Sequence, residues 1–117
     1  MNTVERGRWG ERQALAFLEK KGYALVTQNF RSRFGEIDLI VKDSEFVVFV
    51  EVKLRKNANF AHAREFVSYH KQKKLRATAS LWLSMRKTKL QPRFDVIEVY
   101  AQGLDSMPQI NHIENAF

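Results

Sequence analysis

The chain contains no cysteine, only two prolines and five glycines, and no long apolar run. The lack of cysteine excludes disulfides, thiolate metal ligands and cysteine nucleophiles, and it is compatible with a reducing compartment. No apolar run approaches the roughly 20 residues that a membrane-spanning helix needs, and the first residues lack the apolar segment of a signal peptide. These absences predict a cytoplasmic protein without a membrane partner.

The 117 residues have the composition of a folded globular chain, with 44% hydrophobic and 28% charged residues. This length predicts a single domain over residues 1–117. Acidic residues are fewer than basic ones, 13 against 20, which gives a formal charge of +7. The segment from Lys53 to Arg93 contains 12 basic residues and one acid, Glu65. A basic segment of this kind favours a polyanionic partner such as nucleic acid, although basic surfaces also serve solubility alone.

Hydrophobic periodicity and turn residues predict helices and strands in the order α-β-β-β-α-β, an α/β fold. Thr3 is the expected cap of the first helix, and Gly22 follows its end. Asp43-Ser44 is the expected turn of a hairpin. The predicted helices are 3–21 and 63–85, and the predicted strands are 23–29, 36–42, 45–54 and 93–101, with a further edge strand at 110–113.

The predicted hairpin gathers acidic side chains on one face. Because side chains alternate along a strand, Glu51 and Lys53 share a face with Val47 and Phe49. A two-residue turn at Asp43-Ser44 sets Glu36 opposite Glu51 and Asp38 diagonal to Glu51. Carboxylates placed in this way repel each other and need a cation, which Lys53 supplies in part and a divalent metal would supply more fully. Oxygen ligands without cysteine or paired histidines favour Mg²⁺ or Mn²⁺ over zinc.

Glu11 is the acidic residue of interest in the first helix. It falls on one helical stripe with Gly7, Ala14 and Leu18, and we expect this helix to cover the face that bears the hairpin acids. An acid on a packed stripe is either paired, for example with Lys53, or functional. The alternative interpretation is that the hairpin acids are solvated residues on an exposed sheet face.

Several phrases of the sequence resemble a known family. They are Gly10-Glu11, Gly22-Tyr23, Asn29-Phe30-Arg31, the run from Gly35 to Ile40, the run from Val48 to Arg55, and Phe94-Asp95-Val96-Ile97. Together they resemble the YraN-like bacterial family over nearly the whole chain. Asp38 followed by Glu51-Val52-Lys53, with Glu11 upstream, also resembles the PD-(D/E)XK nuclease superfamily, in its Holliday junction resolvase-like branch. Ile37 stands where the superfamily usually has proline.

The resemblance implies a restriction-endonuclease-like three-layer fold, in which a mixed central β-sheet is flanked by helices. It implies that Asp38 and Glu51 bind Mg²⁺ or Mn²⁺, with the Val52 carbonyl as a third ligand and Glu11 binding directly or through water. It implies that Lys53 orients or activates the attacking water and stabilises the charge that develops in the transition state. Lys71 would face the site or the phosphate backbone. A homodimer follows if the chain resembles the resolvases in this respect as well.

The function expected from these features is metal-dependent endonuclease cleavage of phosphodiester bonds in branched or otherwise structured DNA. The alternatives are a non-catalytic nucleic-acid-binding module that keeps the fold, and an interaction protein whose acids only form salt bridges. We expect Asp95 to pair with an arginine outside the catalytic set, and 55–64 to form a loop that orders on DNA. The residues expected to contact nucleic acid are Arg31, Arg33, Arg55, Lys71 and Lys74.

Overall fold

The computed structural model describes residues 2–55, 67–101 and 107–117. Its elements follow the expected order, with the additional edge strand present at the C-terminal end. In the described part of the chain, no helix is both long enough and apolar enough to cross a membrane. The elements are α1 (Thr3–Lys20), β1 (Ala24–Arg31), β2 (Glu36–Lys42), β3 (Phe46–Arg55), α2 (Tyr69–Ser84), β4 (Gln91–Tyr100) and β5 (Gln109–Ile113).

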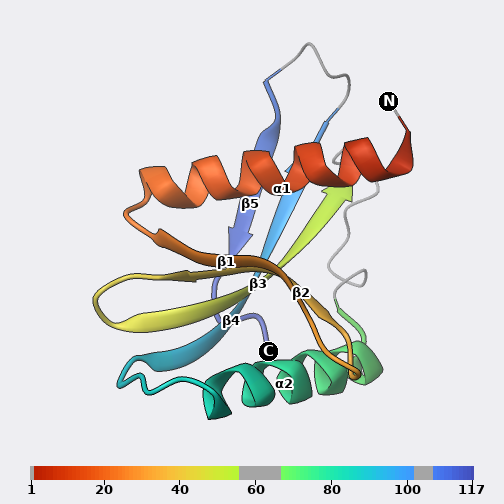
Figure 1. Cartoon of the computed structure of the whole chain (residues 1–117). Helices are drawn as coiled ribbons and strands as arrows, with labels where there is room; N and C mark the ends of the chain where they lie inside the picture. Colours follow the sequence, from red (N-terminus) through yellow and green to blue (C-terminus); the bar gives the residue numbers. More distant parts are fainter. Residues whose placement is uncertain (1, 56–66, 102–106) are drawn as a thin grey trace.

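The strands form one mixed sheet in the order β1-β2-β3-β4-β5. The pairs β1–β2, β2–β3 and β4–β5 are antiparallel, whereas β3 and β4 are parallel. Helix α1 lies on one face of the sheet and α2 on the other (Figure 1). The arrangement confirms the predicted α/β fold with helices on both sides of a mixed central sheet.

Each face of the sheet has its own hydrophobic core. On the α1 face, Ala14 and Leu18 pack in one cluster with buried β-strand residues that include Leu39 and Val50. On the α2 face, the buried helix residues join a second cluster around Phe49. The α2 residues of that cluster are Leu75, Ala79 and Trp82. Burial on opposite faces fixes which side chains of each strand point to which helix.

Helix α1 differs in detail from its prediction. Asn2, and not Thr3, caps its N-terminus, since the Asn2 side chain accepts a hydrogen bond from the N–H of Glu5 at 2.8 Å. Gly22 follows the helix with φ of +101°, a left-handed conformation that glycine adopts without strain. The buried stripe consists of Gly10, Ala14 and Leu18. Gly7, predicted to lie on this stripe, is exposed, so Glu11 lies beside the buried stripe and not at its centre.

The helix that covers the acidic face is α2, and the prediction that α1 covers it was wrong. Val47 and Phe49, which share that face with Glu51, belong to the cluster under α2. The connection between the parallel strands β3 and β4 contains α2, and such crossovers place their helix on one preferred face because their handedness is fixed. Helix α1 is therefore left to pack on the opposite face.

The hairpin register also differs from the prediction. Observed partners are Ile40 with Phe49 and Lys42 with Val47, a shift of two residues from the expected pairing. The cause is Asp43, whose carboxylate accepts hydrogen bonds from the N–H groups of Glu45 at 2.8 Å and Phe46 at 2.7 Å. These bonds centre the turn on Ser44-Glu45. A shift of two residues keeps Val47, Phe49 and Glu51 on their predicted face, whereas Ile37, predicted to share the face of Leu39, packs with Ile40 in the other cluster.

Strands β2 and β3 separate beyond the pair Leu39–Val50, where their regular pairing ends. In Figure 1, β3 continues towards α1 while the β1–β2 hairpin curves towards α2. We call the opening between them the β2–β3 fork. Extending the register places Asp38 opposite Glu51 at the base of the fork, whereas Glu36 pairs with Arg31 of β1. The predicted pairing of Glu36 with Glu51 is therefore wrong.

Strand β4 carries a buried ion pair that ties the C-terminal segment to the sheet. Arg93 binds Asp95 through two hydrogen bonds of 2.9 and 2.7 Å, which confirms the predicted arginine partner. Asp95 also bonds to His112 of β5 at 2.7 Å and accepts the N–H of Asn115 at 3.0 Å. This network fully occupies Asp95, so its place in the structure is as a support of β4 and β5.

Helix α2 begins at Tyr69, after the Ser68 cap, and not at residue 63. Residues 63–66 of the predicted helix, and 56–64 of the predicted DNA-ordering loop, lie outside the described residues. Leu75, Thr78 and Trp82 lie on one stripe of this helix and are buried. Lys71, on the same stripe, is half-buried and contacts Glu51 at the β2–β3 fork.

Candidate functional site

The β2–β3 fork brings Asp38 and Glu51 together. Asp38 Oδ2 accepts a hydrogen bond of 2.8 Å from the Val52 N–H, which bridges the two strands where their regular pairing has ended. The Asp38 carboxyl is also within hydrogen-bond reach of Glu51. The two acids that the sequence singled out thus meet across the base of the fork.

Glu51 is the most buried acid of this cluster, with only 5% of its side chain exposed. Its Oε2 atom is in direct ionic contact with Lys71 Nζ and lies 3.7 Å from Lys53 Nζ. The two lysines come from different elements, Lys53 from β3 itself and Lys71 from the first turns of α2. A single buried carboxylate oxygen is therefore faced by two ammonium groups.

The electrostatics of Asp38 reflect its surroundings. Burial, a hydrogen bond with Glu51 and the negative charge of Glu51 raise its pKa from 3.8 to about 8. The bond from the Val52 N–H opposes this rise, while the charge of Glu11 adds to it. A second negative charge at this position is thus unfavourable unless a further cation approaches.

The pKa values of the two lysines move in opposite directions. Burial lowers the pKa of Lys53, and the charge of Lys71 lowers it further, against the opposing effect of Glu51. Burial also acts to lower the pKa of Lys71, but its hydrogen bond and charge interaction with Glu51 outweigh this, so the Lys71 pKa is raised. The closer partner of Glu51 is therefore Lys71, and Lys53 is the ammonium that more readily releases a proton.

Glu11 reaches the fork from the α1 side of the sheet. Its Oε1 accepts a hydrogen bond from Asn29 Nδ2 at 3.1 Å, and its charge is felt at Asp38. Asn29 itself has φ of +50°, a conformation that asparagine tolerates better than most residues. Glu11 is thus oriented by Asn29 of β1, and not by the salt bridge to Lys53 that the sequence left open.

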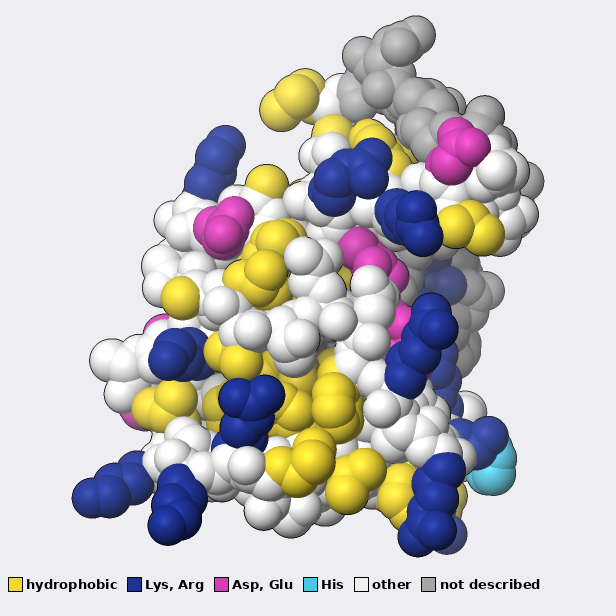
Figure 2. Space-filling model, in the orientation of Figure 1, with side chains coloured by type: hydrophobic (Ala, Val, Ile, Leu, Met, Phe, Trp, Pro, Cys, Tyr) yellow, Lys and Arg dark blue, Asp and Glu magenta, His cyan; other side chains and the backbone are white. Residues whose placement is uncertain are grey.

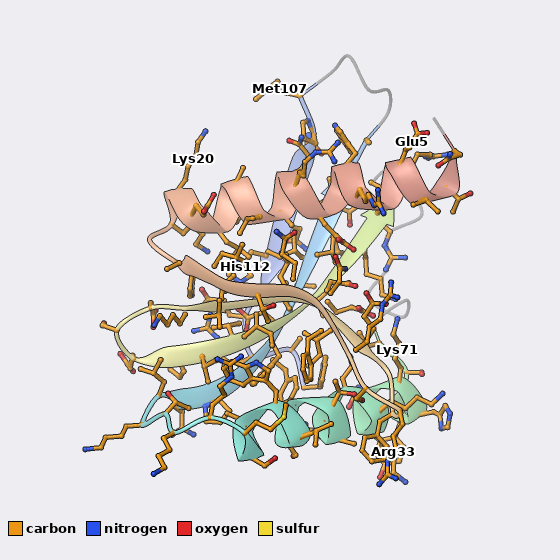
Figure 3. All side chains as sticks on the ribbon, in the orientation of Figure 1. Glu5, Lys20, Arg33, Lys71, Met107 and His112 are labelled. Atoms are coloured by element: carbon orange, nitrogen blue, oxygen red, sulfur yellow. The ribbon has the colours of Figure 1, made fainter. Side chains whose placement is uncertain are left out.

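The residues predicted to contact nucleic acid surround the fork unevenly. Arg31 lies 3.6 Å from Glu36 and is largely exposed, and Arg33 stacks over the ring of Phe34 at the hairpin tip. Figure 3 shows Lys71 beside the fork and Arg33 near the start of α2. Lys74 is exposed on α2. On the right of Figure 2, where the fork opens, basic side chains border acidic ones.

Arg55 is the exception among these basic residues. Its Nε lies 3.4 Å from Glu98 Oε2, and only 17% of its side chain is exposed. Glu98 in turn accepts a hydrogen bond from Asn111 of β5 at 2.9 Å. Arg55 thus helps to join β3, β4 and β5, and it offers less surface to a partner than Arg31 or Lys74.

The donor set at the fork fits a hard divalent cation. Two carboxylates converge there, and the Val52 carbonyl faces the same side as the Val52 N–H that binds Asp38, because both groups of a strand residue point towards one neighbour. Oxygen donors of this kind suit Mg²⁺ or Mn²⁺. In the described ranges, no three acidic or histidine side chains are close enough to form a metal cluster on their own. The Glu11 carboxylate binds Asn29 instead and acts on Asp38 through its charge.

Sequence reasoning missed two features of this site. Asn29 was not singled out, and Lys71 was placed near the site only through the family resemblance. One signal was available for Lys71, since a lysine between Val67 and Leu75 on an apolar stripe requires an acidic partner. Asn29 has a positive φ and β1 has a bulge between Leu25 and Thr27, and no sequence pattern indicated either feature.

Fold and site together define a three-layer α/β protein in which a buried and a half-buried carboxylate meet at a fork in the sheet and two lysines face the buried one. The chain belongs to the Uncharacterised protein family UPF0102, whose model matches residues 10–99. It is 43% identical to a UPF0102 protein of Thermodesulfovibrio yellowstonii, over 100% of this chain and 99% of that protein. It is 43% identical to one of Clostridioides difficile, with both chains fully covered, and 44% identical to one of Vibrio parahaemolyticus over 94% and 89%. The resemblance to the YraN-like family is thereby confirmed.

Proposed function

We infer that this protein is a metal-dependent endonuclease of the PD-(D/E)XK type, which hydrolyses phosphodiester bonds in branched or otherwise structured DNA. The observation that carries the proposal is the meeting of Asp38 and Glu51 at the β2–β3 fork, with Lys53 on the same strand as Glu51. A purely structural salt bridge needs one acid and one base. Here a second, half-buried acid is added, and its raised pKa marks a position where negative charge is disfavoured.

Each residue of the site has a distinct task in this proposal. Asp38 and Glu51 hold the metal, with the Val52 carbonyl beside them and Glu11 acting through water. Bound there, Mg²⁺ or Mn²⁺ would neutralise phosphate oxygens and make a coordinated water more acidic. Lys53 directs an ammonium at the same place, where it stabilises charge that develops on the phosphate in the transition state.

The basic residues around the fork position the nucleic acid. Arg31, Arg33 and Lys74 are exposed and lie on the β1–β2 hairpin and α2, the two elements that flank the fork on the α2 side. Contacts of this kind bind the phosphate backbone without reading sequence. Such a surface suits recognition of a DNA structure better than recognition of a particular base sequence.

The test is cleavage of labelled DNA by the purified protein with Mn²⁺ or Mg²⁺. We expect cutting of a four-way junction or a flap, and its loss in Asp38→Ala and in Glu51→Ala. Glu45→Ala is the matched control, because this exposed acid lies at the hairpin turn and its N–H bond to Asp43 survives the substitution. Cutting that persists in both Asp38→Ala and Glu51→Ala contradicts the mechanism.

A second candidate, a non-catalytic nucleic-acid-binding module, is favoured by one observation. Lys71 already neutralises Glu51, so the cluster can persist without a metal. This candidate predicts junction or duplex binding that weakens steeply with salt and does not respond to divalent ions. Binding measured across a salt series, with Mg²⁺ and with a chelator, separates it from the endonuclease.

A further inference from the structure

Lys71 contacts the buried carboxylate that would hold the proposed metal. Its Nζ touches Glu51 Oε2, and this contact is closer than the 3.7 Å between Lys53 Nζ and the same atom. Mg²⁺ binds carboxylate oxygens at about 2.0–2.1 Å. An ammonium group and a divalent ion held at one carboxylate would lie close together and repel each other.

Lys71 is also the cation of the site that is free to leave. Its side chain is 45% exposed, against 26% for Lys53 and 5% for Glu51. Its backbone is fixed in α2, where the Ser68 cap accepts the Lys71 N–H at 3.1 Å, so the side chain can swing without unfolding the helix. Lys53, by contrast, projects from the central strand β3.

We propose that Lys71 is the resident counter-ion of Glu51, that a divalent metal displaces it, and that the released ammonium then binds the phosphate backbone. The proposal rests on the metal-binding function inferred above and adds a role for a residue outside the ligand set. In the metal-free protein, Lys71 keeps the buried carboxylate paired. Metal occupancy converts the same side chain into a phosphate ligand, so metal binding and nucleic-acid binding reinforce each other.

Competition makes a quantitative prediction for metal affinity. Lys71→Met removes the competing cation and keeps the length of the apolar stem. We expect its dissociation constant for Mn²⁺, measured by calorimetry, to fall about tenfold, since one charge-assisted hydrogen bond no longer has to be broken. Lys73→Met is the matched control, because it removes the same charge from the same helix while its ammonium lies over the Tyr69 ring. We expect the Mn²⁺ affinity of Lys73→Met to stay within twofold of that of the wild type.

A second measurement uses the unaltered protein, so that it does not depend on the folding of a variant. Adding Mg²⁺ should shift the side-chain NMR resonances of Lys71 towards those of an exposed lysine, while those of Lys73 stay in place. A Lys71 that keeps its metal-free resonances at saturating Mg²⁺ overturns the proposal.

The outcomes also separate this proposal from the function on which it rests. If the wild type binds Mn²⁺ and Lys71→Met binds it equally well or more weakly, the displacement of Lys71 is overturned and the metal site stands. Failure of both the wild type and Lys71→Met to bind Mn²⁺ at millimolar concentration overturns the metal site itself, and the displacement with it. Tighter Mn²⁺ binding by Lys71→Met, with unchanged binding by Lys73→Met, supports both the metal site and the displacement of Lys71.

Discussion

Asp38 accepts the backbone N–H of Val52 at 2.8 Å, at the point where β2 and β3 cease to pair. This bond replaces a lost backbone contact between the strands and holds the carboxyl beside Glu51. The molecule therefore keeps an acid where its charged form is unfavourable, a feature typical of functional sites that trade stability for chemistry.

Asp38→Asn should stabilise the metal-free protein. The folded-state pKa of Asp38 is raised from 3.8 to about 8, so the penalty is absent below pH 4, grows as pH rises, and is complete above pH 8. We expect a gain of about 1–2 kcal/mol in the free energy of unfolding at pH 8 and almost none at pH 4. Urea unfolding at both pH values, with a chelator present, measures it. Asp43→Asn is the contrasting variant. Hydrogen bonds from the N–H groups of Phe46 and Glu45 lower the Asp43 pKa, so loss of the Asp43 charge should destabilise the folded protein.

Asp95→Asn should destabilise the protein by about 3 kcal/mol at pH 7, because it removes the closest carboxylate partner of the buried Arg93 charge. Burial alone would raise the Asp95 pKa, but hydrogen bonds from His112, Arg93 and Asn115 lower it. The stability that Asp95 contributes is therefore present above pH 4 and is lost as pH falls through its lowered pKa. Denaturant unfolding should show the wild type and the variant converging towards acid pH. A constant difference between pH 7 and pH 3 would contradict this.

Asn29 is predicted to serve both the backbone and Glu11. Asn29→Ala should cost about 1–2 kcal/mol, because alanine tolerates φ of +50° less well than asparagine does. Asn29→Gly relieves this strain but also removes the hydrogen bond to Glu11. Thermal unfolding should therefore separate the two variants, whereas metal-dependent cleavage should be reduced in both. Full cleavage by Asn29→Gly would show that Glu11 needs no support from this side chain.

Gly10 lies where α1 crosses β3, and a β-carbon there would meet Leu54 at 3.6 Å, an ordinary contact distance. Gly10→Ala should raise the free energy of unfolding by up to about 1 kcal/mol, through its better helix propensity. Gly10→Leu should lower it, because a larger side chain has to displace Leu54. Calorimetric melting of both variants tests whether the close approach of α1 limits the size of this residue.

Local patterns account for most of what the sequence predicted correctly. The bounds of β2 match the predicted strand 36–42, and Asp38, Glu51 and Lys53 share a face because they belong to one hairpin whose side chains alternate. The register was missed because the Asp43 side chain, and not a two-residue motif, positions the turn. A local pattern specifies which face a residue takes more firmly than which residue lies opposite.

The helical members of the site were harder to place. The positions of Glu11 and Lys71 depend on which face each helix covers, and that depends on the crossover between the parallel strands β3 and β4. The prediction that α1 covers the acids placed Glu11 too close to the centre of the site. It also failed to bring Lys71 of α2 next to Glu51. No periodicity within a helix contains this information, because it is a property of the chain path.

The parallel pairing of β3 with β4 also bears on the order of folding. Asp38 and Glu51 lie in adjacent strands of one hairpin, whereas Lys71 arrives only with the crossover helix. Contacts close in sequence form at lower entropic cost than distant ones, so the two acids meet before their lysine partner is in place. Their repulsion should oppose the early hairpin, and we expect refolding to accelerate as falling pH protonates the two carboxyls. The arrangement that prepares the acids for a cation thus also slows the chain on its way to the native state.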